Sequence, residues 1–207
     1  YKLHESSSIG GGVEFLNRRL SSKLFEDLAN GAKRLLDFLL GRRVERLARR
    51  RVAGHKAHLR AVGHGLSVYM LQFMKGSPNY GELASAEKLP GFTIEQSGRD
   101  EFVDKSNPAQ VDIDLAAEGL AKARAALTGG EYDMVILDEA NVALDFGLIE
   151  LDDVLSLIDM RPAHVELVLT GRSAHPSVVK AADLVSEVLN IRHHYDAGVE
   201  AREGVEY

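Results

Sequence analysis

The strongest constraint on the fold is a run of apolar residues that ends at two adjacent carboxylates. The run Met134–Leu137 is followed directly by Asp138 and Glu139. An uninterrupted apolar run bounded by charge is typical of a strand that is buried on both faces of a parallel sheet. Ligands of open α/β sheets bind at the carboxyl ends of the strands, so the two acids are expected where a ligand would bind.

Strand-like and helix-like patterns alternate along the chain on either side of this run. Such alternation predicts an α/β fold with a mostly parallel sheet flanked by helices and joined by right-handed crossovers. The expected strands are Leu66–Phe73, Phe92–Gln96, Tyr132–Leu137, Val165–Thr170 and Leu184–Ile191, and the expected helices are Val111–Leu127, Leu151–Ile158 and Pro176–Ala182.

The first 59 residues follow a different pattern, which divides the chain into residues 1–59 and an α/β domain at residues 60–207. Val13–Leu40 has the apolar spacing of an amphipathic helix, so an extra N-terminal helical segment is expected. Arg42–Leu59 continues as a basic helix, which is either a solvated face or a patch that attracts anions or nucleic acid. His55 and His58 on this helix are interpreted as a surface pair.

Composition narrows the classes of function. The chain has 207 residues, 45% of them hydrophobic and 27% charged, which is enough for one domain with a substantial core. A net charge of −6 argues against general nucleic-acid binding. No apolar stretch approaches the ~20 residues that span a bilayer, and neither a membrane span nor a signal peptide is expected. There are no cysteines, so a reducing cytoplasm is expected.

From Arg60 onward the chain resembles the P-loop-type ATP:corrinoid adenosyltransferases of vitamin B12 biosynthesis and salvage. The resemblance depends on LDEANVALDFG, RP-x-H, LTGR and YDAG occurring in this order. It implies a P-loop NTPase (RecA-like) architecture and transfer of the 5′-deoxyadenosyl group of ATP to Co(I) of a corrinoid, cob(I)yrinic acid a,c-diamide or cobalamin. It further implies Mg²⁺ (or Mn²⁺), a flavin-type reductase that supplies Co(I), and a homodimer.

The resemblance also implies roles for residues at the carboxyl ends of the expected strands. Asp138 and Glu139 would coordinate Mg²⁺ and position phosphate, unless one of them only caps the following turn. Lys75 follows the first strand and could neutralise a triphosphate oxygen, or it could simply be solvated. Arg172 follows Thr-Gly and could bind phosphate or form a structural salt bridge. Asn141 is expected in the active-site loop.

The corrinoid side depends on the segment EFVDK. The resemblance implies apolar side chains here that displace the lower axial ligand of cobalt. Phe102 is the candidate for this contact, although a phenylalanine could also belong to the core. The position where many relatives have tryptophan holds Asp104 or its neighbour.

One expected motif is missing. Family members carry a Gly-Asn-Gly-Lys-Gly-Lys-Thr-Thr type loop, which corresponds here to Glu45–Val52 with the sequence ERLARRRV, and GxxxxGK[ST] occurs nowhere in the chain. Glycines let backbone N–H groups surround phosphates, and the lysine and threonine supply a charge and a Mg²⁺ ligand. Two explanations remain open: a paralogue that has lost ATP chemistry, and a shifted reading frame in the unmatched residues 1–59, which start with Tyr1 rather than methionine.

Overall fold

A parallel sheet of six strands organises the part of the chain that the structure describes. This computed structural model describes residues 43–47, 52–188, 191, 193, 198–200 and 202. The sheet lies in the compact unit Leu40–Tyr207 and has the strand order β3-β2-β4-β5-β1-β6. Its strands are β1 (Arg43–Leu47), β2 (Val68–Phe73), β3 (Phe92–Ser97), β4 (Met134–Asp138), β5 (Glu166–Leu169) and β6 (Leu184–Val188).

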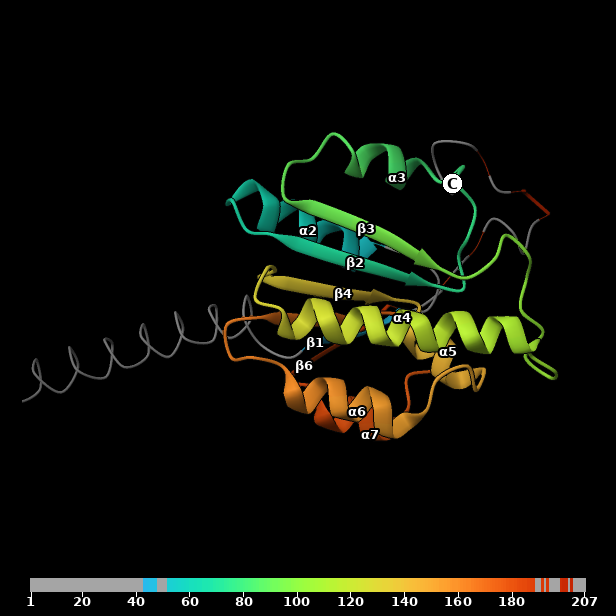
Figure 1. Cartoon of the computed structure of the whole chain (residues 1–207). Coiled ribbons are helices and arrows are strands. Elements are labelled where there is room, and N and C mark those ends of the chain that lie inside the picture. Colours follow the sequence, from blue (N-terminus) through green and yellow to red (C-terminus); the bar gives the residue numbers. More distant parts are fainter. Residues whose placement is uncertain are drawn as a thin grey trace, which may run out of the picture. The chain divides into compact units, whose positions relative to one another are not determined.

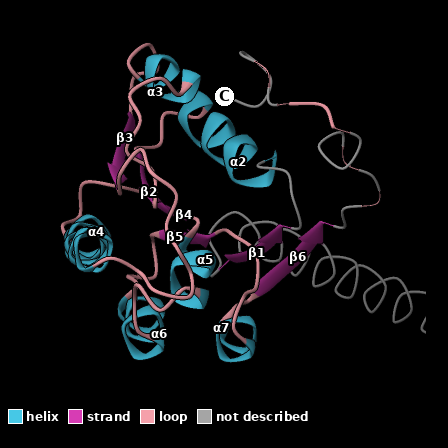
Figure 2. Ribbon diagram, turned by 90° about the vertical axis from the view of Figure 1, so that its right-hand side faces the viewer, coloured by secondary structure: helices cyan, strands magenta, loops and turns pink. Residues whose placement is uncertain are grey.

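Helices cover both faces of the sheet, which confirms the predicted fold class (Figures 1 and 2). The helices α2 (Val52–Gly63) and α3 (Gly81–Ala86) lie on one face. The other face carries α4 (Gln110–Thr128), α5 (Ala140–Asp145), α6 (Leu151–Met160) and α7 (Pro176–Ala181).

Strand β4 shows why the sheet is buried on both sides. Val135 and Leu137 belong to the core cluster that includes residues of α4 and α6, whereas Met134 and Ile136 belong to the cluster that includes Ala57 of α2. Successive side chains of a strand point to opposite faces, so an apolar run without alternation is what a strand between two helical layers requires.

The segment after Arg42 corrects one prediction. Arg43–Leu47 is not the start of a basic helix but the strand β1, which pairs in parallel with β5 and β6. Backbone pairing with strands far along the chain overrides a local sequence that favours a helix. The sheet therefore begins upstream of residue 60, the predicted start of the α/β domain. The helix expected at Val13–Leu40 lies outside the described residues.

The remaining predicted strands and helices are present, with ends that differ by a few residues. The short helix α5 had not been expected, because six residues are too few to show a helical period. His58 is not on the surface: its side chain is buried and its ring stacks on Phe92 at 4.4 Å between centroids. Within the described ranges, no helix has the length and apolar character needed to cross a membrane.

Candidate active site at the carboxyl edge of the sheet

The ends of three adjacent strands bring the expected polar residues together. In the register of β2 and β4, Gln72 lies opposite Asp138, and Lys75 follows two residues after the end of β2. Thr170 follows β5 on the other side of β4. Because all three strands run in parallel, their last residues lie at one edge of the sheet.

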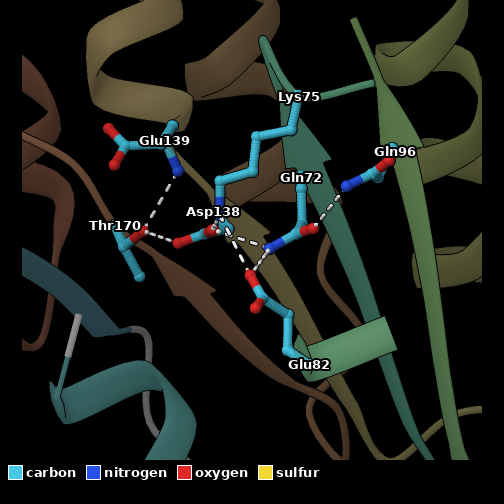
Figure 3. A network of polar contacts seen from close by, with 7 residues as sticks. All are labelled: Gln72, Lys75, Glu82, Gln96, Asp138, Glu139 and Thr170. Carbon is cyan, nitrogen blue, oxygen red and sulfur yellow. Dashed lines mark hydrogen bonds and ion pairs between the residues drawn. The ribbon is translucent and has the colours of Figure 1, made fainter. Parts of the chain in front are cut away.

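Asp138 is the centre of a buried polar network (Figure 3). Its Oδ2 accepts a hydrogen bond from Lys75 Nζ at 2.7 Å and another from Gln72 Nε2 at 3.3 Å. Its Oδ1 accepts from Thr170 Oγ1 at 2.8 Å. The side chains of Lys75 and Asp138 are only 5% and 8% exposed, so Lys75 is an ion-pair partner and not a solvated side chain.

A second carboxylate extends the network on the side of β2. Glu82, in the first turn of α3, lies 3.7 Å from Lys75 Nζ and accepts a hydrogen bond from Gln72 Nε2 at 3.2 Å. Gln96 of β3 donates to Gln72 Oε1 at 3.2 Å. The lysine also lies 5.6 Å from the centre of the Tyr80 ring. One cation thus lies close to two carboxylates and an aromatic ring.

Glu139 differs from Asp138 in its environment, although the two are neighbours in the sequence. Its backbone is left-handed (φ 61°, ψ 16°), and its N–H donates to Thr170 Oγ1 at 3.1 Å. Its half-buried carboxylate points away from that of Asp138 (Figure 3). The structure therefore brings Lys75 and Thr170 to Asp138, but it does not bring the two carboxylates together.

Left-handed backbone marks the same edge of the sheet. Besides Glu139, the non-glycine residues with positive φ in the described chain are Met74 (61°) and Ser173 (57°). These residues follow β2 and β5, respectively. Non-glycine residues in this conformation are destabilised, and they concentrate at ligand-binding sites because the surrounding structure holds them there. The backbone thus identifies this edge independently of the side chains.

The expected loop residue Asn141 lies in the first turn of α5. Its N–H donates to the Thr170 carbonyl at 3.1 Å, and its Nδ2 donates to the Gly171 carbonyl at 3.4 Å. These two hydrogen bonds connect α5 to the residues that follow β5. Gly171 has a φ of 120°, and a Cβ there would lie 3.1 Å from the Val142 nitrogen, so this position requires glycine. Arg172 follows with an exposed side chain and does not join the network around Asp138.

Phe102 is fully exposed (relative accessibility 103%), which excludes the interpretation that it belongs to the core. Asp104 is polar, so it does not supply the apolar contact that a tryptophan at this position would make. Its Oδ1 instead accepts hydrogen bonds from the N–H and the hydroxyl of Ser106, at 2.9 and 2.6 Å. These hydrogen bonds lower the pKa of Asp104 below its usual value.

The turns that follow β2 and β3 touch through their backbones. A Cβ on Gly76 would lie 2.4 Å from the Gly98 carbonyl oxygen, and one on Gly98 would lie 2.5 Å from the Lys75 nitrogen. The Met74 N–H also donates to the Ser97 carbonyl at 3.0 Å. The segment that carries Phe102 is thus in direct contact with the segment that carries Lys75.

Sequence reasoning missed Thr170, Gln72, Gln96 and Glu82 as parts of this site. Thr170 and Gln72 lie in segments that resemble the family, LVLTGR and LQFMKG. Their polar side chains at the ends of apolar strands were the available signal. Glu82 carries no such signal, because its place beside Lys75 depends on how α3 folds back.

The donors around Asp138 fit a magnesium ion in part. Mg²⁺ prefers oxygen ligands and is commonly bound by one or two carboxylates together with phosphates and water. Asp138 supplies such a carboxylate and Thr170 a hydroxyl. Among the described residues, no group of three or more acids or histidines could hold a metal ion by itself. A metal here would therefore take its other ligands from water or from the phosphates of a nucleotide.

Comparison with known proteins identifies the family. The sequence profile described as "ATP:corrinoid adenosyltransferase BtuR/CobO/CobP" matches residues 52–207. The chain belongs to the ATP:corrinoid adenosyltransferase family. The matched region starts at the first residue of α2, so β1 and residues 48–51 precede it.

Named relatives cover most of this adenosyltransferase-family chain. The "Corrinoid adenosyltransferase" of Pseudomonas aeruginosa is 38% identical over 148 residues, which are 72% of this chain and 73% of that protein. The "Corrinoid adenosyltransferase CobA" of Salmonella typhimurium is 32% identical over 156 residues, 72% of this chain and 74% of that protein. The "Corrinoid adenosyltransferase" of Escherichia coli is 31% identical with the same coverage.

Proposed function

We propose that this chain transfers the 5′-deoxyadenosyl group of ATP to the Co(I) of a corrinoid, cob(I)yrinic acid a,c-diamide or cobalamin. Cobalt supplies the electron pair that forms the Co–C5′ bond, the C5′–O bond breaks, and triphosphate leaves with that bond's electrons. The observation that carries the proposal is the buried Lys75–Asp138 pair at the ligand-binding edge of a sheet that belongs to this family. A charged pair buried at that edge favours a phosphate ligand over an apolar one.

Asp138 is the proposed ligand of Mg²⁺, and Lys75 is the proposed partner of the triphosphate. The ion would neutralise phosphate charge and so stabilise the leaving group. Both oxygens of Asp138 accept hydrogen bonds, from Lys75 and from Thr170, and these bonds would orient the carboxylate that holds the ion. Glu139 remains a candidate ligand because of its position next to Asp138.

The other residues that the resemblance implicates have proposed roles around this centre. Arg172 is exposed beyond the end of β5 and could contact phosphate from outside the network. Asn141 holds α5 against β5 and so positions Glu139. Phe102 would contact the corrinoid. A flavin-type reductase that supplies Co(I), a homodimer and a cytoplasmic location complete the proposal.

A second candidate is a corrinoid-binding paralogue that does not bind ATP tightly. The observation that favours it lies at Glu45–Val52, where relatives carry the phosphate-binding loop. Glu45, Arg46 and Leu47 pair with β6 as part of β1, and Val52 begins α2. Only residues 48–51 connect the two elements, and their sequence, ARRR, contains no glycine. Without glycine, this connection lacks the residues that let backbone N–H groups surround a phosphate.

Calorimetric titration with Mg·ATP separates the two candidates when it is paired with a repaired variant. In that variant, Gly-Asn-Gly-Lys-Gly-Lys-Thr-Thr replaces residues 45–52. We expect weak ATP binding by the chain as it stands, and tighter binding together with adenosylation of a Co(I) corrinoid after the replacement. Corrinoid binding should be similar in both proteins, which serves as the internal control.

Two results would contradict these expectations for the unaltered chain and the repaired variant. A dissociation constant in the low micromolar range for the unaltered chain would show that the arginines replace the glycine loop. A repaired variant that is folded by circular dichroism, yet neither binds ATP nor adenosylates a corrinoid, would favour the paralogue.

A further inference from the structure

The segment that carries Phe102 is fixed at its beginning by a forked ion pair. We name residues 98–107 the Phe102 loop. Arg99 Nε and Nη2 donate to the two carboxylate oxygens of Asp112 in α4, at 2.8 and 2.9 Å. The Asp112 side chain is only 3% exposed, and the hydrogen bonds from Arg99 lower its pKa. Arg99 Nη1 also donates to Glu101 within the loop. Two parallel hydrogen bonds to a buried acid fix both the position and the direction of the guanidinium.

A second anchor, an ion pair whose side chains are 55% and 30% exposed, lies in the other half of the loop. Lys105 Nζ lies 2.7 Å from Asp145 Oδ2 at the end of α5 and 5.5 Å from the centre of the Phe146 ring. Around Lys105, the Asp104 carboxylate accepts hydrogen bonds from the N–H and the hydroxyl of Ser106 and closes a tight turn. The Phe102 loop is thus attached to α4 on one side and to α5 on the other.

Phe102 lies between the two anchors with its whole side chain in solvent. A free loop would bring such a ring against the nearest apolar surface, because burying a phenylalanine side chain contributes about 1.5–3 kcal/mol. The Phe102 ring is exposed and does not gain this free energy of burial, although a large core cluster lies beneath the neighbouring helices. The anchors therefore set where the ring can be.

We infer that Arg99 and Lys105 are positioning residues, which hold the Phe102 loop so that Phe102 is presented to a corrinoid before the corrinoid arrives. This inference depends on the proposed function, which assigns Phe102 to the corrinoid. An ordered loop does not have to lose conformational freedom on binding, so its affinity is higher than that of a loop that must first be ordered. Neither residue contacts the reacting atoms in this role.

A fluorescent reporter at the tip of the loop tests the inference. The chain contains no tryptophan, so Phe102→Trp creates a single indole that can be excited apart from the tyrosines. Time-resolved anisotropy of this indole measures the motion of the loop, and its quenching by added hydroxocobalamin measures corrinoid binding. Both are recorded in the full chain with Arg99→Gln, with Lys105→Gln and with both changes.

Lys122→Gln is the matched control. Lys122 lies on α4, as Asp112 does, and forms ion pairs with Glu95 at 3.3 Å and Glu118 at 3.2 Å outside the loop. A second comparison is Arg99→Lys, which keeps the charge but cannot form the fork.

We expect Arg99→Gln with Lys105→Gln to increase the fast motion of the indole and to weaken hydroxocobalamin binding about tenfold. Lys122→Gln should change neither quantity, Arg99→Lys should be intermediate, and ATP affinity should be the same in all variants. Unchanged motion and unchanged quenching in the double variant would overturn the positioning role while leaving the corrinoid contact in place. An indole that hydroxocobalamin does not quench, even with both anchors intact, would overturn the assignment of Phe102 to the corrinoid, and the positioning role with it.

Discussion

Replacing Lys75 by methionine would leave the buried carboxylate of Asp138 without the ammonium group that lies 2.7 Å from it. Methionine nearly preserves the volume of the lysine stem, so the change removes charge more than packing. Removing one partner of a buried ion pair costs about 3–5 kcal/mol. Asp138 would keep its hydrogen bonds from Thr170 and Gln72. We therefore expect a loss of stability at the lower end of this range, about 3 kcal/mol. Urea denaturation followed by circular dichroism measures this change in the free energy of unfolding.

A double-mutant cycle shows whether the loss comes from the pair. The variant with Lys75→Met and Asp138→Asn buries neither charge, so it should be more stable than the sum of the single losses predicts, by about 2 kcal/mol. The control is Lys122→Met, which removes an exposed lysine from pairs with Glu95 and Glu118 and should cost about 0–1 kcal/mol. Equal losses in Lys75→Met and Lys122→Met, with no coupling to Asp138, would refute the reasoning.

Three further predictions address the acid pair, a glycine and an ion pair of the loop. Asp138→Ala should lower the rate of corrinoid adenosylation, followed by absorption, about 10²-fold, and an unchanged rate would make this acid purely structural. Gly171→Ala should cost about 1–3 kcal/mol in urea denaturation, and more than Gly147→Ala, because only the former also places its Cβ against backbone. Arg99 lowers the folded-state pKa of Asp112, so the stability from that shift is present above the unfolded pKa of about 3.9 and is lost as the pH falls through the folded value. Asp112→Asn should therefore lose less stability than the unaltered chain in acid, and an identical acid dependence would contradict the prediction.

The sequence predicted most of the sheet because its core strands are apolar on both faces. Strand β4 could be predicted from Met134–Leu137, since four consecutive apolar residues followed by charge are typical of a strand buried on both faces. Strand β1 could not, because Arg43–Leu47 has three charged residues out of five, and only its partners β5 and β6 make it a strand. Pairing with strands far along the chain cannot be predicted from the sequence of the strand itself.

The candidate site was predictable in its position but not in its contacts. The rule that parallel strands end at one edge placed Lys75 near Asp138, and the structure gives that pair a distance of 2.7 Å. The rule says nothing about the direction of a side chain, so it could not separate Asp138, which points into the network, from Glu139, whose left-handed backbone turns it away. The functional roles of these residues stay predictions.

The backbone contact between Gly76 and Gly98 connects two segments with different proposed ligands. The Lys75 segment is proposed to bind the triphosphate, and the Phe102 loop is proposed to bind the corrinoid. No side chain separates these turns, and a Cβ at either position would overlap the other turn. A shift of the Lys75 segment on nucleotide binding must therefore move the start of the Phe102 loop or break the hydrogen bond from Met74 to Ser97. If that movement changes the affinity for the corrinoid, the corrinoid changes the affinity for the nucleotide by the same factor. ATP and the corrinoid would then bind as a thermodynamically coupled pair, with the coupling located in two glycines.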